Sequence, residues 1–507
     1  MDTYHAWTVR IDRAHILYAW CDHVTALANN LSNAVRFRQR QLLTASHKSP
    51  DQWSDNEKEI VRELAAYGPD LGIRSESVPA SITSRQMEAL LRASANPDFF
   101  AKGLPRQSAQ HVVSQTYADV DHYYAALADY QEHPEKYQAM PRYPGYKRKG
   151  GRATVYVSNQ DCTLKTGPDG RLYARLPFAK DKPFCIGSPE GKLAEVKVSP
   201  DNGNFNLSFV FQQEASDAVP GEPDRICAID MGVENLMAVT NNAGLPCLLF
   251  KGGGVKSTNR LYNKHLAVIM AEEMAKPDCP TKRDGSPRFV PTDASRALTA
   301  RRNAVIQDWM SKTAKRLVDW CVENRIDTIV CGVNKGWKQN VSMGHVNNQT
   351  FVQIPFERLR WQISYRAGER GIRYVEQEES YTSKASFPDR DPIPVYGQND
   401  AEPHFSGHRA PKQYRGMHSE NGFRGLYKTM DGTILNSDLN GSANILRKAF
   451  PGAFEGHPKP DFNRVQVIET PDQERTAANY QRQKAVPHTV SRSKARRLRR
   501  KAKHISG

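Results

Sequence analysis

The sequence lacks the features that would place a protein in a membrane. No run of it approaches the roughly 18 to 20 apolar residues that a membrane-spanning helix needs. The N-terminus also lacks the basic and then apolar layout of a secretory signal peptide. We therefore expect a cytoplasmic protein with no membrane partner.

Paired cysteines are absent as well. The eight cysteines are scattered along the chain, and no two of them form a CxxC pair. A structural zinc site needs four ligands at close, paired spacing, and an intracellular protein keeps its thiols reduced. The sequence therefore predicts reduced, mostly buried cysteines and no cysteine-based zinc site.

A phosphate-binding P-loop is missing too. Residues 251–255 read Lys-Gly-Gly-Gly-Val, but the Lys-Ser or Lys-Thr pair that would complete the motif does not follow. We expect this glycine run to be a flexible connection.

Acidic residues are fewer than basic ones. The 507 residues include 55 Asp and Glu against 71 Lys and Arg, which gives a formal net charge of +16. Charged residues make up an average 25% of the chain, so the excess lies in the sign of the charge and not in its density. This balance favours a polyanionic partner, with nucleic acid ahead of an anionic membrane surface or simple solubility.

The residue pattern predicts a multidomain α+β protein. An alternating first strand at residues 1–12 precedes a helical region at 13–140. A small antiparallel β-barrel is expected over 141–215, and an α/β domain over 225–450. Residues 451–507 are expected to form a basic, disordered tail.

The α/β domain begins with a buried strand that ends in Asp230 and turns into a second strand. A long helix at 294–323 lies within a helical insertion at about 255–325. Further strands, a loop-like stretch at 385–430 and a last helix from 437 to 450 follow. This order of elements, with an acid after the first strand and another at the final helix, is that of a ribonuclease-H-like α/β domain.

Three carboxylates stand at the ends of these elements: Asp230 after a strand, Glu378 or Glu379 after another strand, and Asp438 before a helix. A pair of divalent metal ions about 4 Å apart needs several hard oxygen ligands on rigid elements. Each acid taken alone is better explained by a turn, a solvated strand end or a helix N-cap. Taken together, they favour a Mg²⁺-dependent site that cleaves phosphodiesters.

Basic residues gather at the end of the first helix, in the loop at 141–152 and in the tail at 492–503. The loop interleaves basic and aromatic residues, which suits phosphate contacts and base stacking, although a solvated turn explains it equally well. The predicted nucleic-acid contacts are Arg36, Arg38, Arg40, Arg142, Tyr143, Tyr146, Lys147, Arg148, Lys149 and Lys384.

Three motifs carry a family resemblance. They are AIDMGVENL at 228–236, ESYTSK at 379–384 and DGTILNSDLNGSANI at 431–445. They resemble the RuvC motifs of TnpB-like transposon-encoded RNA-guided nucleases and of compact type V CRISPR effectors. The resemblance covers roughly residues 225–450, is weaker over the β-rich region, and is only architectural over the first 130 residues.

The resemblance implies a RuvC nuclease domain, a helical recognition lobe and a wedge β-barrel. It implies an RNA-guided DNA endonuclease of a prokaryotic cell that binds a guide RNA and double-stranded target DNA beside a short adjacent motif. A monomer is favoured. Two Mg²⁺ ions, which Mn²⁺ can replace, would be held by the catalytic residues Asp230, Glu379 and Asp438.

The middle acid departs from the common family pattern. Many members place it at the end of the strand after the long helix, where this chain has Gly332-Val333-Asn334. A subset places it just before the Tyr-Thr-Ser-Lys motif, which favours Glu379 with Glu378 as the alternative. The missing acid keeps open a second function, an RNA-guided DNA-binding protein that acts as a repressor or targeting module without cleavage. A structure-specific nuclease without a guide is a third reading that the helical region and the basic loop make less attractive.

The zinc ribbon of the relatives is the second departure. They carry cysteines after the Thr-Ser pair, and the corresponding stretch of this chain, 385–430, has none. His404, His408 and His418 lie there, and we expect them to be solvated. No structural zinc is predicted.

Overall fold

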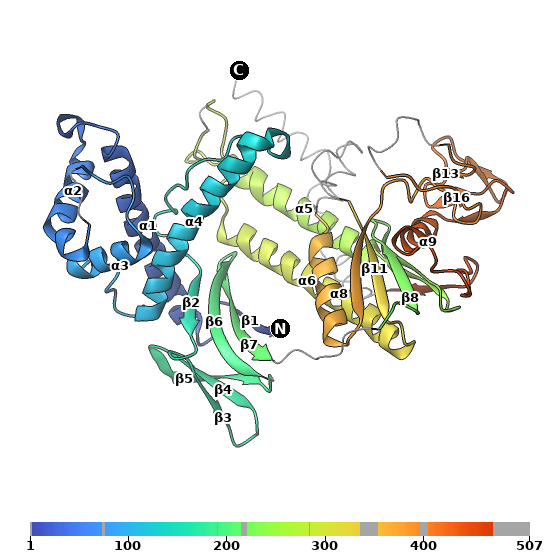
Figure 1. The fold of residues 1–507 in the computed structure, drawn as a ribbon, viewed down its shortest axis with the longest axis horizontal. Helices are drawn as coiled ribbons and strands as arrows, with labels where there is room; N and C mark the ends of the chain where they lie inside the picture. The colour runs from blue at the N-terminus through green and yellow to red at the C-terminus, as the bar shows by residue number, and fades with distance from the viewer. Residues whose placement is uncertain are drawn as a thin grey trace. The chain divides into compact units, whose positions relative to one another are not determined.

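The computed structural model describes residues 3–73, 77–189, 191–213, 221–282, 284–334, 353–395 and 404–469. The chain divides into two compact units, unit 1 at residues 1–215 and unit 2 at residues 216–507 (Figure 1). Within the described ranges, no helix is both long enough and apolar enough to cross a membrane. The basic run predicted to form a disordered tail, at 492–503, lies outside these ranges.

Four helices form one part of unit 1: α1 (Tyr18–Ala45), α2 (Asp55–Tyr67), α3 (Ser84–Ala93) and α4 (Arg106–Glu132). Capping boxes at Ser54 and Thr83 start α2 and α3 by satisfying free backbone N–H groups. Helix α1 packs against α2, α4 and the neighbouring strands, so several of its faces are covered. The region that the sequence predicts to be helical, 13–140, therefore contains these four α-helices within its described residues.

Unit 1 also contains two small antiparallel sheets. The first has the order β1-β7-β6-β2, and the second has the order β3-β4-β5. The strands are β1 (Thr3–Ile11), β2 (Val155–Ser158), β3 (Thr163–Thr166), β4 (Leu172–Leu176), β5 (Ala179–Gly187), β6 (Lys192–Asp201) and β7 (Asn204–Gln213). Strands β1 and β2 form opposite edges and do not pair within the described residues, so the sheet stays open. The predicted closed barrel is not found.

Unit 2 is built on a six-stranded mixed sheet with the order β12-β11-β8-β9-β10-β18. The strands are β8 (Ile226–Asp230), β9 (Asn235–Asn241), β10 (Cys247–Lys251), β11 (Thr328–Val333), β12 (Arg373–Glu378) and β18 (Val465–Ile468). Strands β8, β11 and β12 run parallel, and β9 runs antiparallel to both of its neighbours. Because β18 pairs with β10, the predicted start of the disordered tail at residue 451 is too early.

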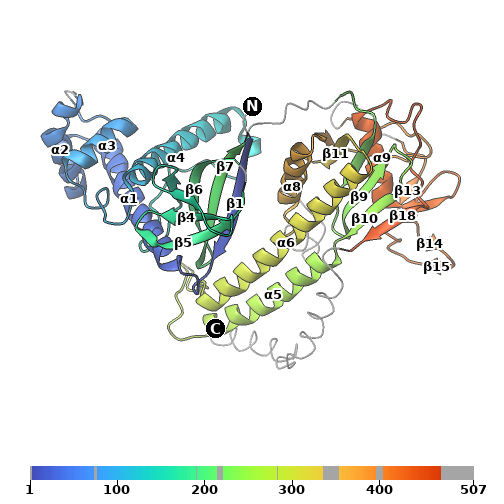
Figure 2. The ribbon, with the colours of Figure 1, turned by 90° about the horizontal axis from the view of Figure 1, so that it is seen from below.

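Helices pack on both faces of this sheet (Figures 1 and 2). They are α6 (Asp293–Glu323), α8 (Phe356–Glu369) and α9 (Ser437–Ala449), and a further helix, α5 (Gly253–Met274), packs along α6. Cys227 and Ile229 of β8 join a core with α6 and α8, whereas Ala228 packs with Ile445 of α9. This alternation follows from the two-residue period of a strand, and it turns the next residue, Asp230, toward α9.

The predicted flexible connection at 251–255 is wrong. Helix α5 begins at Gly253, immediately after β10, with Gly252 as its N-cap residue. A Cβ atom on Gly254 would lie 1.8 Å from Cη2 of Trp309. The glycine therefore allows α5 to pack directly against α6, which no larger residue would allow.

The stretch predicted as loop-like at 385–430 contains short paired strands. They are β13 (His408–Arg409), β14 (Gln413–Tyr414), β15 (Met417–His418) and β16 (Leu426–Lys428), and β16 also pairs with β17 (Ile434–Asn436). Asp391 is buried and accepts hydrogen bonds from the backbone N–H groups of Ser386 (2.8 Å) and Ser406 (3.1 Å). Asp389 accepts from both serine hydroxyls, at 2.6 and 3.1 Å. Carboxylates thus hold this stretch together, and the three histidines named above are exposed.

Candidate active site and nucleic-acid interface

Asp230 lies at the C-terminal end of β8 and is pressed against helix α9. A Cβ atom on Gly441 of that helix would stand only 2.4 Å from Oδ2 of Asp230. Ser442 holds the two elements together, because its Oγ donates to the carbonyl of Ala228 (2.8 Å) and accepts from the N–H of Thr240 (3.1 Å). Position 441 therefore requires glycine if the carboxylate is to stay in place.

Glu379 follows the end of β12 and occupies the space beside the neighbouring strand. A Cβ atom on Gly332 of β11 would lie 2.7 Å from Oε2 of Glu379, and its other oxygen accepts a hydrogen bond from Nδ2 of Asn334 (3.2 Å). Gly332 belongs to the segment in which many members of the family carry the middle acid. The structure thus places the carboxylate of Glu379 where the missing side chain leaves room.

Glu378, the sequence alternative, is engaged elsewhere. Its carboxylate accepts hydrogen bonds from Nζ of Lys448 at 2.7 Å and from the hydroxyl of Ser380. Burial acts to raise the pKa of Glu378, but these hydrogen bonds outweigh it and hold the pKa below its usual value. A carboxylate already neutralised by a lysine is a poor candidate for a cation ligand.

Asp438 is in the first turn of α9, but it is not the N-cap. Oδ1 of Asn436 accepts from the N–H groups of Asp438 (3.0 Å) and Leu439 (3.1 Å), as a capping residue does. The Asp438 carboxylate instead accepts from Nδ2 of Asn235 on β9 (2.8 Å), and Arg409 lies 3.9 Å away. The simple capping explanation for Asp438 is therefore excluded.

The other polar residues of the α9 motif dock the helix. Nδ2 of Asn444 donates to the carbonyls of Thr382 (2.8 Å) and Ala385 (2.7 Å), and Nδ2 of Asn440 also donates to Ala385 (2.8 Å). These buried amides fix the turn that follows Glu379. The sequence motif is thus largely a set of docking contacts around two acids.

Asp230 is close enough to Asp438 and Glu379 for their negative charges to act on it. Burial raises the pKa of Asp230 well above its usual value, and the charges of Asp438 and Glu379 raise it further, whereas Arg409 acts in the opposite direction. Burial also raises the pKa of Glu379 to about 7, with a second contribution from Glu378. Carboxylates gathered in this way store repulsion that a cation relieves.

The donor chemistry of this cluster suits a hard divalent cation, because all three side chains offer carboxylate oxygens. As the described residues stand, no group of three or more His, Cys, Asp or Glu side chains is placed to hold a metal ion. The carboxylates would therefore have to draw closer around an ion. The raised pKa values of Asp230 and Glu379 indicate that their charged forms lack a neighbouring positive charge large enough to offset burial, which a bound cation would supply.

A second candidate region is the basic loop of unit 1, residues 142–152. Its main chain is fastened to α1 by two asparagines. Nδ2 of Asn29 donates to the carbonyl of Arg148 (3.1 Å), and Asn33 both donates to the carbonyl of Lys147 (3.0 Å) and accepts from its N–H (2.8 Å). Arg152 closes the loop through a bidentate pair with Asp22, with both contacts at 2.8 Å. The loop conformation is therefore fixed through its backbone.

The side chains of this loop remain available. Arg142, Tyr146, Lys147, Arg148 and Lys149 are all exposed. Within the described residues, none of the basic ones enters an ion pair with a carboxylate. Arg40 lies over the rings of Tyr143 (5.8 Å) and Tyr146 (5.5 Å), so the aromatic residues are also held in place. The predicted contact residues of the loop and Arg40 thus form one surface, which we call the basic loop surface.

Arg36 and Arg38 do not belong to this surface. Both are buried: Arg36 donates to Asp119 (3.2 Å) and to the Thr116 carbonyl (3.2 Å), and Arg38 forms a bidentate pair with Glu63 (2.8 and 2.9 Å). Because α1 is covered on several sides, these guanidinium groups stabilise the helices of unit 1. Their predicted contact with nucleic acid is therefore wrong for this structure.

Lys384 is exposed in unit 2, and its Nζ lies 5.8 Å from the ring centre of Tyr381. Tyr381 itself has a positive φ of 63°, in the turn directly after Glu379. A non-glycine residue in this conformation marks local strain, which clusters at functional sites. Lys384 therefore remains a candidate contact residue, although it forms no part of the carboxylate cluster.

Sequence reasoning missed four residues that position the acids. They are Asn235, Gly332, Asn334 and Gly441. Asn235 and Gly441 lie inside the motifs that carried the resemblance, so the signal was present without an assigned role. Gly332 and Asn334 lie in the segment where the middle acid was expected. They act only on Glu379, which follows the neighbouring strand β12.

No protein-family model matches the chain. No curated protein matches it either. Among solved structures, it is similar to the Cas12f1 complex with guide RNA and target DNA, at 11% identity over 87% of this chain and 98% of that chain, with a TM-score of 0.28. It is also similar to the mini RNA-guided endonuclease CRISPR-Cas-phi3, at 8% identity over 90% and 93% of the two chains, with a TM-score of 0.40.

A third similar structure is that of Alicyclobacillus acidoterrestris C2c1 with single-guide RNA, at 9% identity over 83% of this chain and 70% of that chain, with a TM-score of 0.27. The solved structures to which the chain is similar are thus those of Cas12f1, CRISPR-Cas-phi3 and C2c1. Because every one of these TM-scores is at or below 0.40, any statement about function has to rest on the residues of this chain.

Proposed function

We propose that this protein is an RNA-guided DNA endonuclease with a Mg²⁺-dependent site at Asp230, Glu379 and Asp438. The observation that carries the proposal is the convergence of three carboxylates from β8, the end of β12 and the start of α9. The negative charges of Asp438 and Glu379 both raise the pKa of Asp230. Ligands of open α/β sheets bind at the carboxyl ends of the strands, which is where Asp230 and Glu379 lie.

The topology of the sheet supports a ribonuclease-H-like RuvC assignment for residues 225–450. Its first five strands have the order β12-β11-β8-β9-β10, and only β9 runs against the others. Helices α6 and α8 pack on one face and α9 on the other. We assign the helices of unit 1 to a recognition lobe and its strands to a wedge.

Asp230, Glu379 and Asp438 would hold the metal ions, which when bound would polarise a scissile phosphodiester and activate a water for in-line attack. The remaining residues act on the acids. Asn334 orients Glu379, Asn235 orients Asp438, and the docked α9 fixes Asp438 relative to Asp230. The chain thereby holds the oxygen ligands on three separate elements.

Guide RNA and double-stranded target DNA are the partners that we propose. The support is the net charge of +16 together with the basic loop surface, whose cations have no internal carboxylate partner within the described residues. Phosphate neutralisation of this kind makes binding strongly dependent on salt concentration. Sequence recognition would come from base pairing with the guide.

The test begins with the protein expressed together with its flanking genomic DNA. Co-purifying RNA is sequenced, and matched and mismatched DNA are then incubated with the complex and Mg²⁺. We expect guide-dependent cleavage that Asp230→Asn abolishes. The control variant is Glu376→Gln. Glu376 lies on β12, the strand that ends at Glu378, but its side chain is half exposed and pairs with Arg360 (3.3 Å).

Two results would contradict the proposal in different ways. A complex that contains RNA and binds matched DNA, but does not cut it under any Mg²⁺ or Mn²⁺ condition, would identify the binding-only alternative. Cleavage that ignores the guide sequence would identify a nuclease without a guide. Loss of cleavage in Glu376→Gln as well would show that the assay reports folding and not the site.

A further inference from the structure

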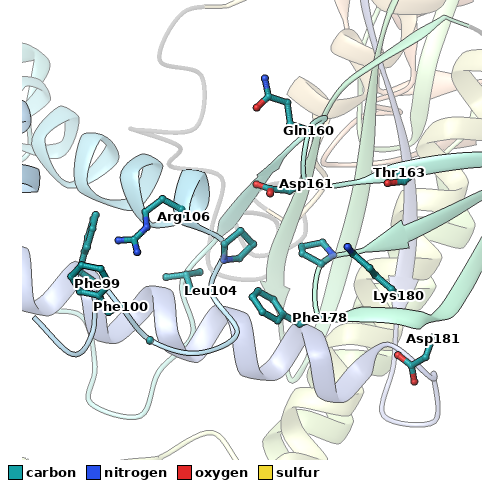
Figure 3. A pocket seen from close by; sticks show the side chains of 13 residues that line it. Phe99, Phe100, Leu104, Arg106, Gln160, Asp161, Thr163, Phe178, Lys180 and Asp181 are labelled. Carbon is teal, nitrogen blue, oxygen red and sulfur yellow. The ribbon is translucent and has the colours of Figure 1, made fainter. Parts of the chain in front are cut away.

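Unit 1 contains a cavity of about 780 Å³ that is separate from both regions described above (Figure 3). It lies between the α3–α4 connection, the start of α4, the β2–β3 turn and the β4–β5 turn. Its volume falls within the roughly 300 to 1,000 Å³ that is typical of small-ligand pockets. None of the residues predicted to contact nucleic acid lines it.

Two phenylalanine rings stand exposed in this cavity. Phe100 is 47% exposed and Phe178 is 63% exposed. The guanidinium of Arg106 lies 4.3 Å from the ring centre of Phe100, and the buried Phe99 supports the same ring edge-on at 5.5 Å. Phe100 is thus presented as a fixed aromatic surface, although burial in the core would have been more favourable for a phenylalanine.

Phe178 is held in an unfavourable backbone conformation. It is the second residue of the two-residue turn Pro177-Phe178 between the paired Leu176 and Ala179, and its φ is +59°. Glycine is the residue that adopts this conformation without steric cost. The turn is secured by Nε1 of the buried Trp20, which donates to the carbonyl of Pro177 (2.7 Å). An exposed ring at a position that favours glycine has no explanation in packing.

The polar rim of the cavity is balanced in charge. Arg106 and Lys180 contribute two positive charges, and Asp161 and Asp181 contribute two negative charges. Gln160 is oriented by Gln107, whose Nε2 donates to Oε1 of Gln160 (2.6 Å), so its own amide nitrogen remains a donor. A rim with no net charge disfavours a free phosphate or an anionic headgroup. It suits a flat, neutral ligand that has both donors and acceptors at its edge.

We propose that this pocket binds unpaired nucleobases, which stack on the exposed rings of Phe100 and Phe178 beside the polar side chains of Gln160 and Asp161. The bases belong to the guide RNA or to the DNA, both of which offer the same chemistry. This proposal rests on the proposed function only in taking nucleic acid as the partner. It does not depend on cleavage.

The experiment uses the full chain with short single-stranded RNA and DNA probes that carry 5-iodouracil. Ultraviolet light crosslinks this base to aromatic side chains that stack on it, and mass spectrometry maps the peptides. We expect crosslinks at Phe100 or Phe178, and stronger labelling by one probe identifies RNA or DNA as the source. Each probe is also titrated by fluorescence anisotropy against wild type, Phe178→Gly, Phe100→Ala and the control Tyr4→Ala, which removes an equally exposed ring from β1.

Phe178→Gly separates binding from folding. Glycine relieves the positive φ, so the melting temperature should stay level or rise, while affinity for the preferred probe should fall about five- to a hundredfold. Phe100→Ala should show a similar loss, and Tyr4→Ala should show none. Crosslinks confined to other residues, or unchanged affinity in Phe178→Gly, would overturn the proposal. If Phe178→Gly changes the oligomeric state of the protein but leaves probe binding unchanged, the proposal is wrong, and the pocket instead holds a side chain of another protein molecule.

The two proposals fail independently. If the pocket crosslinks to the probe but the wild-type complex never cuts matched DNA, only the endonuclease proposal is wrong. If Asp230→Asn abolishes cutting and keeps wild-type crosslinking, both stand. If guided cutting occurs but the pocket neither crosslinks nor affects probe affinity, only the nucleobase proposal is wrong.

Discussion

The basic loop surface of unit 1 and the carboxylate cluster of unit 2 both hold like charges close together, but they do so by opposite means. In the loop, asparagine side chains hold the main chain and leave the cations facing solvent, where water screens their repulsion. In the cluster, glycines make room for carboxylates that are partly buried, and amides hold their oxygens. Repulsion is therefore low in the first region and stored in the second.

This difference indicates which region depends more on its surroundings. A solvated cation keeps its charge and function wherever the backbone places it, so substitutions nearby should have modest effects. A buried carboxylate depends on each neighbouring atom, because burial and repulsion together set its pKa. The cluster should therefore be the more sensitive of the two regions to substitution.

The largest effect is expected from the adjacent glutamates. Glu379→Gln should lower the rate of guided cleavage by about a thousandfold or more. Losses of this size follow when a group that stabilises charge in the transition state is removed. Glu378→Gln should keep the rate within about tenfold and instead lower the free energy of unfolding by about 1 to 3 kcal/mol, because Lys448 is left without its carboxylate. Single-turnover cleavage and chemical denaturation measure the two quantities. The reverse ranking would make Glu378 the middle acid.

The second prediction concerns the glycine beneath Asp230. Gly441→Ala should reduce cleavage by about ten- to a hundredfold, because its Cβ would stand 2.4 Å from Oδ2 and displace the carboxylate. The control is Gly368→Ala in α8, where an added Cβ has no neighbour within 4 Å. That substitution should leave cleavage unchanged and slightly stabilise the helix. Equal activity in both variants would show that Asp230 is not confined by α9.

The third prediction concerns the basic loop surface. A triple variant with alanine at positions 147, 148 and 149 should weaken nucleic-acid binding about tenfold or more. It should also reduce the slope of log affinity against log salt concentration by about 2 to 3, because each lost phosphate contact lowers that slope by roughly 0.7 to 0.9. Arg38→Gln is the contrasting variant. It should lower stability by about 3 kcal/mol, because Glu63 loses its buried partner, and should leave the salt slope intact. A slope changed by Arg38→Gln and not by the triple variant would reverse the assignment.

The smallest effect is a pH dependence of metal binding. The pKa of Glu379 is raised to about 7, so below that pH the carboxyl group is protonated and has to lose its proton before it can bind a cation. The Mg²⁺ concentration for half-maximal cleavage should therefore rise as the pH falls from 8 to 6, by up to about tenfold per pH unit below the pKa. Glu378→Gln removes a charge that contributes to the shift, so it should move this transition to lower pH. A flat profile would mean that Glu379 binds no metal.

Local periodicity was enough to predict most of the elements that build the site. The helix expected at 294–323 is α6, and the acid-ended strand is β8, because long amphipathic runs and short buried runs report directly on one face of an element. The predicted barrel was not found because closure depends on whether the edge strands β1 and β2 meet, which no local pattern specifies. Coverage of α1 by several elements likewise decided the burial of Arg36 and Arg38.

The choice between Glu378 and Glu379 shows the same limit inside the site. The two residues are adjacent, Glu378 as the last residue of β12 and Glu379 directly after it, and their types are identical. They differ only in what the neighbouring elements offer, a lysine from α9 for Glu378 and an empty glycine position on β11 for Glu379. Such information lies 45 to 70 residues away in the sequence, so it becomes visible only in the folded chain.

Gly332 and Glu379 together have a consequence for how such a site can evolve. An acid on β11 and an acid after β12 compete for the same volume, so a lineage cannot hold both at full size. If Glu379 is the ligand that we propose, its loss while position 332 stays glycine leaves the site one ligand short. Positions 332 and 379 are therefore coupled, and an acid introduced at 332 requires a smaller residue at 379.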